Sequence, residues 1–226
     1  MGDKISLNIM DSTAKGLGLG EPTGIELYEA VGRRANAQSK AEAYKDDKDQ
    51  QGWYPADQVL ASIGQSLNEF TPMQLCSYTS TLANRGIRYK ATFLNRVVSS
   101  DYRHLELENS PVILSTMAIS DEAYYNYTAG MRAVVTSGTA YRIFGNYPVE
   151  VAAKTGTAEH SNGQNVSDHG AFVCYAPFND PQIAVAVYGE KAGHGSTMGQ
   201  IAKAVLDAYF DDPEASDTTT NENGVS

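Results

Sequence analysis

Apolar residues recur at helical spacing in four segments of this chain. Thr71 and Pro72 supply an N-cap and a proline at the first helical position, and Gly86 ends the segment that follows. Ser120 begins another such segment, which ends at Gly138. The pattern therefore predicts helices over 5–15, 71–86, 120–138 and 198–210, the first of them ended by a run of glycines.

The last third of the chain changes from helical spacing to β-rich runs separated by turn residues. These runs cover 149–157, 170–175 and 182–188, and they predict three strands. Shorter extended segments are expected over 87–98 and over 25–27, the latter after a turn at 21–24.

Two polar segments carry no such pattern. Residues 33–52 are rich in charge and are expected to form a surface loop or insertion. Residues 212–226 are polar and acidic and are expected to be a disordered tail. The rest of the chain, residues 1–211, is expected to be folded.

Composition and charge narrow the classes of function. With 226 residues, 42% of them hydrophobic, the chain is long enough for one sizeable core. The 17 basic and 27 acidic residues give a net charge of −10, which repels phosphate backbones and argues against a nucleic-acid partner. No window approaches 18 consecutive apolar residues, and no segment of signal-peptide type follows Met1, so a soluble chain is expected.

The thiols and imidazoles show no metal-binding spacing. Cys76 and Cys174 each lie in an apolar stretch and are expected to be small buried side chains. The four histidines are scattered, without a cysteine cluster beside any of them. We therefore expect neither a metal nor another cofactor.

The tetrapeptide Lys154-Thr-Gly-Thr157 is the most informative short motif. A lysine near the end of a strand, followed by two hydroxyls around a glycine, suits the binding of a carboxylate beside an extended peptide. Strand alternation places Thr155 and Thr157 on one side and Lys154 on the other, unless the strand bulges at Gly156. Taken alone, the tetrapeptide fits an ordinary solvated strand end better, since Thr and Gly are common at strand ends.

Other blocks of the chain, in order, give the tetrapeptide its context. Together with it they resemble the C-terminal part of the transpeptidase domain of class B, high-molecular-weight penicillin-binding proteins, over roughly residues 1–210. The blocks lie at 18–27, 63–66, 70–75, 81–84, 153–159, 172–177, 180–181 and 193–195.

The resemblance implies a fold and an activity. The fold is of the α/β (α+β) serine β-lactamase and transpeptidase type, an antiparallel sheet flanked by helices, with its N-terminal part missing from this chain. The activity is that of a serine-type D-Ala-D-Ala transpeptidase or carboxypeptidase, which cross-links peptidoglycan stem peptides through an acyl-serine intermediate. Intact members are anchored at the extracytoplasmic face of the bacterial membrane, and their partners are stem peptides ending in D-Ala-D-Ala, β-lactam antibiotics and cell-wall synthesis machinery.

The resemblance also implies roles for the tetrapeptide. Lys154 would be catalytic and would also supply positive charge near the substrate carboxylate. The hydroxyls of Thr155 and Thr157 would bind that carboxylate, and the catalytic contribution of Thr157 would be a backbone N–H in the oxyanion hole. Gly156 would keep the groove open. Gln65 and His194 lie in family blocks near the cleft. For both residues, a structural role in a turn is expected at least as much as a role in catalysis.

Chance matches imitate the rest of the catalytic motif set. Ser12-Thr-Ala-Lys15 fits Ser-x-x-Lys, and both Ser6-Leu-Asn8 and Ser66-Leu-Asn68 fit Ser-x-Asn. The family nucleophile opens a helix, whereas Ser12 lies toward the end of its predicted helix, where the dipole disfavours a developing negative charge. We therefore expect the nucleophile motif to be absent and the chain by itself to be inactive.

Two other functions are compatible with these residues. A β-lactam-sensing receptor domain shares the Lys-Thr-Gly strand but signals instead of turning over. A non-catalytic module that docks on the cell-wall machinery is the second alternative. Formation of a covalent penicillin adduct by the chain would distinguish these possibilities.

Overall fold

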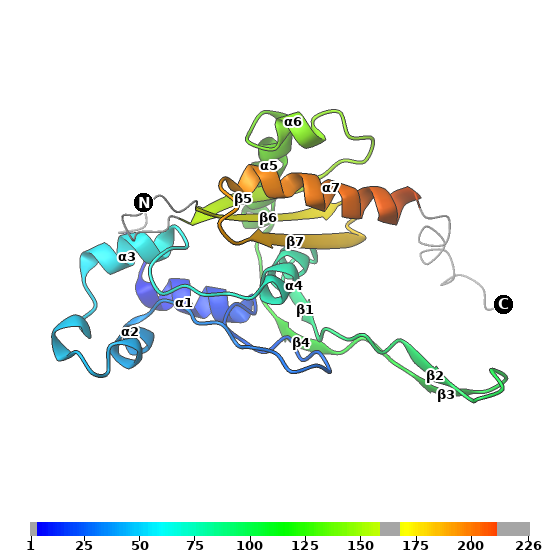
Figure 1. Ribbon diagram of the computed structural model, residues 1–226, viewed down its shortest axis with the longest axis horizontal. Helices are drawn as coiled ribbons and strands as arrows, with labels where there is room; N and C mark the ends of the chain where they lie inside the picture. Colours follow the sequence, from blue (N-terminus) through cyan, green and yellow to red (C-terminus); the bar gives the residue numbers. More distant parts are fainter. Residues whose placement is uncertain (1–3, 159–167, 212–226) are drawn as a thin grey trace. The chain divides into compact units, whose positions relative to one another are not determined.

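The computed structural model describes residues 4–158 and 168–211, and the chain divides into two units, Met1–Ser120 and Asp121–Ser226. Figure 1 shows the helices and strands of both units. The predicted tail, 212–226, lies outside the described residues. Each unit is considered by itself below.

The first unit begins with helices whose ends follow from their capping residues. Ser6 caps the first helix by accepting a hydrogen bond from the Ile9 N–H at 3.3 Å. Thr71 and Gln74 form a capping box at the fourth helix, with Pro72 at its first position. The helices are α1 (Leu7–Gly16), α2 (Ala37–Ala43), the 3₁₀ turn η2 (Lys48–Gln50), α3 (Pro55–Ser62) and α4 (Pro72–Ala83). The helices predicted over 5–15 and 71–86 are thus confirmed.

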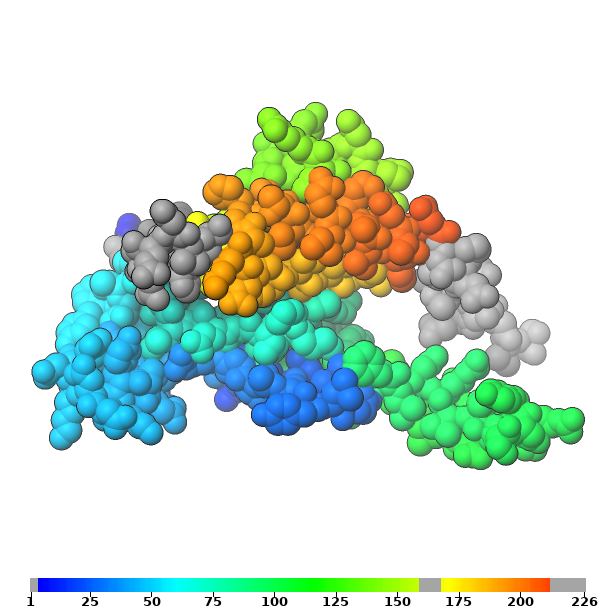
Figure 2. Space-filling view, viewed as in Figure 1, coloured from blue at the N-terminus to red at the C-terminus, as the bar shows by residue number. Residues whose placement is uncertain are grey.

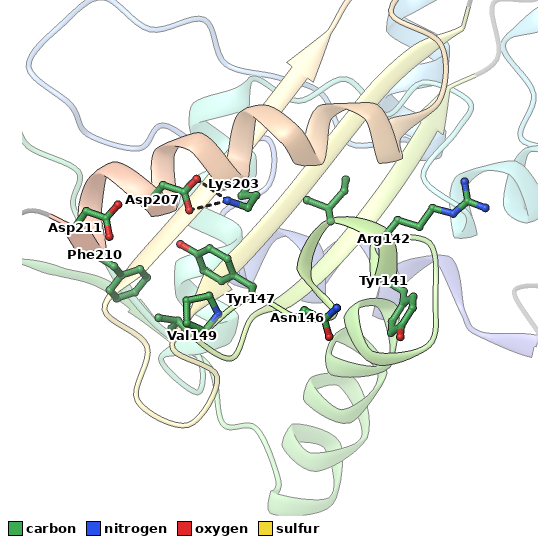
Figure 3. Close-up of a pocket in the computed structure, with 11 residues that line it drawn as sticks. Tyr141, Arg142, Asn146, Tyr147, Val149, Lys203, Asp207, Phe210 and Asp211 are labelled. Atoms are coloured by element: carbon green, nitrogen blue, oxygen red, sulfur yellow. Dashed lines mark hydrogen bonds and ion pairs between the residues drawn. The ribbon is translucent and has the colours of Figure 1, made fainter.

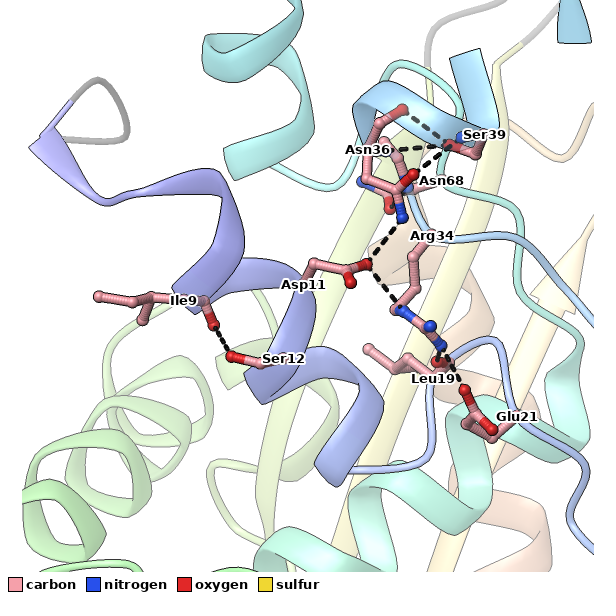
Figure 4. A network of polar contacts seen from close by, with 10 residues as sticks. Ile9, Asp11, Ser12, Leu19, Glu21, Arg34, Asn36, Ser39 and Asn68 are labelled. Carbon is pink, nitrogen blue, oxygen red and sulfur yellow. Dashed lines mark hydrogen bonds and ion pairs between the residues drawn. The ribbon is translucent and has the colours of Figure 1, made fainter. Parts of the chain in front are cut away.

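A polar network holds the loops of the first unit to α1. The Arg34 guanidinium donates to the Asp11 carboxylate, to the Glu21 carboxylate and to the Leu19 carbonyl, at 2.9, 2.9 and 2.6 Å (Figure 4). The Asn36 amide donates to the same Asp11 oxygen at 2.9 Å. Arginine suits this position because its planar fork binds several acceptors at once.

Four short strands form an arm in the first unit. The strand β1 (Ile87–Tyr89) pairs antiparallel with β4 (Ile113–Thr116), and β2 (Arg96–Val98) pairs antiparallel with β3 (Leu105–Glu108). The β2–β3 pair lies at the far end of the arm, labelled in Figure 1 and drawn in green in Figure 2. The expectation of strands within 87–98 is therefore confirmed at its two ends.

Two expectations for the first unit need correction. Residues 33–52 are not a plain loop, because they contain α2 and η2. Two side chains of this segment, Ala35 and Lys40, are buried. The Lys40 ammonium pairs with the Asp57 carboxylate at 2.6 Å. That the segment is an insertion stays a prediction. Residues 25–27 form no strand, since they lie in a bend where Glu29 accepts hydrogen bonds from Thr23 and Gly24.

A three-stranded antiparallel sheet organises the second unit. Its strands are β5 (Ala152–Ala158), β6 (His169–Ala176) and β7 (Ile183–Gly189), in the order β5-β6-β7. The helices are α5 (Asp121–Thr136), α6 (Tyr141–Phe144) and α7 (Gly195–Asp211). All three predicted strands and both predicted helices of this region are confirmed, and the antiparallel sheet with flanking helices is the predicted fold class.

The core of the second unit lies between α7 and one face of the sheet. Phe172 and Cys174 point into it from the central strand, and Ala202 and Leu206 enter it from α7, all with 0% exposure. Figure 1 shows α7 running along this sheet. Cys174 is thus buried as expected, whereas Cys76 is only half-buried.

We predict that Phe172→Ala strongly destabilises the second unit. Phe172 is fully buried and stacks on Phe144, with 5.9 Å between the ring centroids. Because the substitution leaves a cavity, we expect the free energy of unfolding to fall by about 3–5 kcal/mol in urea denaturation. The matched control is Tyr125→Ala on α5, because Tyr125 is 71% exposed. Equal effects of the two substitutions would contradict the assignment of this core.

Candidate active site

The predicted tetrapeptide lies on β5, at the edge of the sheet. Within the described residues β5 pairs with β6 alone, so no strand pairs with its other edge. The strand leaves the core within its own length, because Ala152 and Ala153 are fully buried and Lys154 is exposed. An extended peptide can pair with such an edge by strand addition.

The pairing with β6 decides the direction of each side chain. Thr155 is opposite Phe172 and Thr157 is opposite Gly170, so both threonines lie on the face that α7 covers. Lys154 is opposite Val173, on the other face. The expected alternation is therefore present, without a register shift at Gly156.

Residues from outside the tetrapeptide hold the two hydroxyls. The hydroxyls of Thr155 and Thr139 share a hydrogen bond of 3.0 Å. The Thr157 hydroxyl accepts a hydrogen bond from the Gly195 N–H, at 3.3 Å. Sequence reasoning missed Thr139, which follows the glycine taken as the end of a helix, because no short motif connects it to the tetrapeptide.

The Lys154 ammonium remains at the surface of the strand. It donates to the Thr155 carbonyl oxygen at 2.6 Å. Since the side chain is exposed, the cation is available to an anionic group that approaches β5. A cation and two hydroxyls that project from opposite faces of one edge strand can reach the same carboxylate where it lies at the strand edge, between the two faces.

Gly156 leaves open space above the strand. A Cβ built there would meet the Ala171 Cβ at 3.5 Å, an ordinary contact, so packing inside the protein does not require a glycine. Gly195 differs, because its Cβ would lie 2.0 Å from the Gly156 carbonyl oxygen. The missing side chain at Gly156 therefore leaves room for a ligand on β5 and is not required by packing inside the protein.

The Ser-x-x-Lys match at Ser12 lacks the geometry of a nucleophile. Ser12 lies in the second half of α1, and its hydroxyl donates to the Ile9 carbonyl at 3.2 Å (Figure 4). Ser12 and Lys15 are both exposed. The helix dipole at this end disfavours a developing oxyanion.

The Ser-x-Asn match at Ser66 is structural. The Asn68 amide accepts a hydrogen bond from the Ala35 N–H and donates to the carbonyls of Ala61 and Gln65. Ser66 has a φ of 64°, typical of a turn. Its side chain is exposed, so Asn68 serves here to join loop segments of the first unit.

Gln65 and His194 both take part in local turns through their backbone. The Gln65 N–H donates to the Leu60 carbonyl at 3.0 Å, just after α3. The His194 carbonyl accepts from the Thr197 N–H and hydroxyl, at 3.0 and 2.6 Å. These contacts stabilise a turn and the start of α7, and they leave any role at the cleft a prediction.

A cavity of about 610 Å³ lies elsewhere in the second unit, between α6 and the C-terminal half of α7 (Figure 3). The Lys203 ammonium pairs with the Asp207 carboxylate there at 2.7 Å, and it lies 5.1 Å from the centroid of the Tyr147 ring. Burial and a hydrogen bond to Asp207 raise the pKa of Tyr147 to about 12. No residue of β5 lines this cavity, and two of its charged side chains, Lys203 and Asp207, pair with each other.

Two features are absent from the part of the chain that the structure describes. Within 4–158 and 168–211, no three His, Cys, Asp or Glu side chains are grouped to hold a metal ion. Over the same residues, no helix combines the length and the apolar content that crossing a membrane requires.

Comparisons with known proteins agree on one family. The penicillin-binding protein transpeptidase domain matches residues 1–210. The peptidoglycan D,D-transpeptidase MrdA of Acinetobacter baumannii is 28% identical over 224 residues, which cover 93% of this chain and 32% of the relative. MrdA of Escherichia coli K12 is 29% identical over 208 residues, covering 84% of this chain and 31% of the relative.

Solved structures agree with these relatives. The crystal structure of Pseudomonas aeruginosa PBP2 in complex with WCK 5153 has a TM-score of 0.75 and 27% identity, and the match covers 95% of this chain and 46% of that one. The chain therefore spans about a third of the length of its curated relatives and about half of this solved chain.

We predict that alanine at Gly156 leaves the stability nearly unchanged, whereas alanine at Gly195 lowers it. Gly156→Ala should change the free energy of unfolding by less than about 1 kcal/mol, because its Cβ has room. Gly195→Ala should destabilise by about 1–3 kcal/mol, because its Cβ would overlap backbone oxygens of β5 and β6. Urea denaturation of both variants measures the difference. A large loss at Gly156 would show that the glycine serves internal packing.

Proposed function

The chain belongs to the penicillin-binding protein transpeptidase family, and from this premise we propose that its β5 strand binds the carboxylate of a peptidoglycan stem peptide. The ligand ends in D-alanyl-D-alanine and lies extended along the free edge of β5. The observation that carries the proposal is the exposed Lys154 cation on an edge strand that also bears two hydroxyls.

The reaction in the intact enzyme is a two-step acyl transfer. A serine hydroxyl attacks the carbonyl carbon of the penultimate D-alanine, an ester forms, and the peptide bond to the terminal D-alanine breaks. The serine proton reaches the released amine. In the second step the amine of a neighbouring stem peptide attacks the ester, a new peptide bond forms, and the serine regains its proton.

The tetrapeptide contributes electrostatics and positioning to both steps. Lys154 places positive charge beside the terminal carboxylate and takes part in proton transfer. The hydroxyls of Thr155 and Thr157 bind that carboxylate, with Thr139 and the Gly195 N–H as their supports. The Thr157 N–H is one donor of the oxyanion hole, and Gly156 leaves room for the peptide backbone.

The nucleophile of the proposed reaction is a serine other than Ser12. An exposed hydroxyl in the second half of a helix has neither a buried base nor a favourable dipole. We infer that the chain alone does not form an acyl-enzyme and that β-lactams, which resemble the D-Ala-D-Ala end, acylate the intact protein. The proposed enzyme acts at the extracytoplasmic face of the membrane, together with cell-wall synthesis machinery.

We predict that Lys154→Gln removes the preference for a free carboxylate. A peptide ending in D-Ala-D-Ala should bind the chain at least about tenfold more tightly than its C-terminal amide, because the carboxylate gains charge-assisted hydrogen bonds. NMR titration of the chain with both peptides measures this ratio. Lys154→Gln should bring it close to one.

The control for this titration is Lys203→Gln. That variant also loses one positive charge, but Lys203 pairs with Asp207 on α7, away from β5. It should keep the preference for the carboxylate. The assignment fails if the Lys154 variant keeps the preference, or if both variants lose it equally.

We predict no covalent labelling of the chain by a fluorescent penicillin. The expected result is an unchanged intact mass and no fluorescent band, while an intact relative such as MrdA of Escherichia coli serves as the positive control. Ser12→Ala is the matched variant. An adduct that this substitution abolishes would make Ser12 the nucleophile, and one that persists would place another nucleophile in the chain.

A further inference from the structure

The cavity between α6 and the C-terminal half of α7 has an apolar wall at one end. Tyr147, Val149 and Phe210 form this wall, and Figure 3 shows their side chains beside one another. All three are partly buried and pack against the core of the second unit. The Tyr147 ring meets the buried Phe144 ring edge-on, with 5.6 Å between centroids. The Phe210 ring meets Tyr209 in the same way at 5.1 Å, so both lining rings are fixed before any ligand binds.

A hydrogen-bonded group on α7 lies beside this apolar wall. The Asp207 carboxylate accepts hydrogen bonds from the Lys203 ammonium at 3.0 and 2.7 Å, and another from the Tyr147 hydroxyl. Because the pKa of Tyr147 is raised to about 12, its phenol stays neutral at neutral pH and remains a donor. A carboxylate can accept about four hydrogen bonds, so Asp207 keeps capacity for a donor on a ligand.

Two further polar side chains of the lining are available to a ligand. Arg142 and Asn146 are exposed, and within 4–158 and 168–211 neither side chain takes part in a hydrogen bond or an ion pair. Figure 3 shows Arg142 at the end of the cavity away from Phe210. A guanidinium offers five donors, and an amide offers both donors and an acceptor. The cavity thus presents donors, acceptors and aromatic rings together.

The charges of the lining cancel, which narrows the class of ligand. Arg142 and Lys203 are balanced by Asp207 and Asp211. A ligand with a net charge would meet a like charge as well as an opposite one, and it would lose hydration of its own charge. A wholly apolar ligand would cover charged groups without giving them hydrogen bonds. A neutral ligand with several hydroxyls avoids both costs, because a hydroxyl donates to a carboxylate and accepts from a guanidinium.

We propose that this cavity binds a neutral saccharide. The C–H face of a sugar ring packs on the rings of Phe210 and Tyr147, while its hydroxyls donate to Asp207 and accept from Arg142 and Asn146. The volume of about 610 Å³ lies within the range of roughly 300–1,000 Å³ that is usual for small-ligand sites. The inference goes beyond the proposed function and does not depend on it, because no residue of β5 lines the cavity.

A titration with three trisaccharides tests the charge argument on the full 226-residue chain. The neutral probe is N,N′,N″-triacetylchitotriose, the cationic probe is its fully deacetylated form, and the anionic probe is trigalacturonate. NMR titration gives the dissociation constant of each. The neutral probe should bind at least about fivefold more tightly than either charged one. Its chemical-shift changes should be concentrated at residues 141–149 and 203–211.

Substitutions in the lining test the two kinds of contact. Phe210→Leu keeps the apolar volume but removes the flat ring, and it should weaken the neutral probe about five- to tenfold. Phe210→Tyr retains the ring and should change the affinity less than about twofold. Arg142→Gln removes the charged donor and should weaken the neutral probe about fivefold.

The matched control for the arginine variant is Arg103→Gln. Arg103 is also exposed, but it lies between β2 and β3 in the first unit and does not line the cavity. This variant should bind the neutral probe as the wild type does. A chemical-denaturation curve for each variant verifies that it is folded, which matters most for the partly buried Phe210.

The outcomes decide the saccharide site without touching the carboxylate site. Absence of binding by the neutral probe, shift changes outside the cavity, or tighter binding of a charged probe overturns the inference. Unchanged affinity in both Phe210→Leu and Arg142→Gln also overturns it. Loss of affinity in these two variants, with binding preserved in Phe210→Tyr and Arg103→Gln, supports it. The carboxylate preference at Lys154 is measured with peptides and stands or falls separately.

Discussion

The antiparallel pairing of β5 with β6 is the constraint on which the site depends. It runs without a register shift from Ala152 to Ala158, so the direction of every side chain in Lys154–Thr157 follows from one alignment. A shift by one residue would turn the threonines away from Thr139 and Gly195 and place Lys154 over the α7 core. The buried Phe172 and Cys174 prevent that shift, because they belong to the core and cannot exchange faces with exposed residues.

The site is therefore a consequence of the core beneath it. Burial of Phe172 and Cys174 fixes the register of β5 against β6. This register places the Lys154 cation and the threonine hydroxyls on different faces, and the position of β5 at the sheet edge leaves one side of the strand without a strand partner. The same alignment brings Gly156, Ala171 and Tyr188 into one row, although they lie far apart in the sequence. The directions of the Lys154 cation and of the two threonine hydroxyls thus share a single structural cause.

Polar contacts join several segments of the first unit. Arg34 binds Asp11, Glu21 and the Leu19 carbonyl, and Asn68 forms hydrogen bonds with three backbone groups. Two segments of this unit, at Ser12 and at Asn68, match catalytic motifs but have structural hydrogen bonds instead of catalytic geometry. Ser12 and Asn68 fit short patterns by composition, while the hydrogen bonds of the folded unit give Ser12 a helical partner and Asn68 a structural role.

The sequence by itself determined the segments with strong periodicity and the family. The strands β5, β6 and β7 and the helices α1, α4, α5 and α7 follow from local spacing and capping, and the ordered motif blocks agree with the family match over residues 1–210. Only the tertiary structure decided the short helices α2, α3 and α6, the burial of Lys40 and the partners of the hydroxyls. The physical reason is range: capping and periodicity act within a few residues, whereas the contacts of Thr155 with Thr139 and of Thr157 with Gly195 exist only once distant segments have packed.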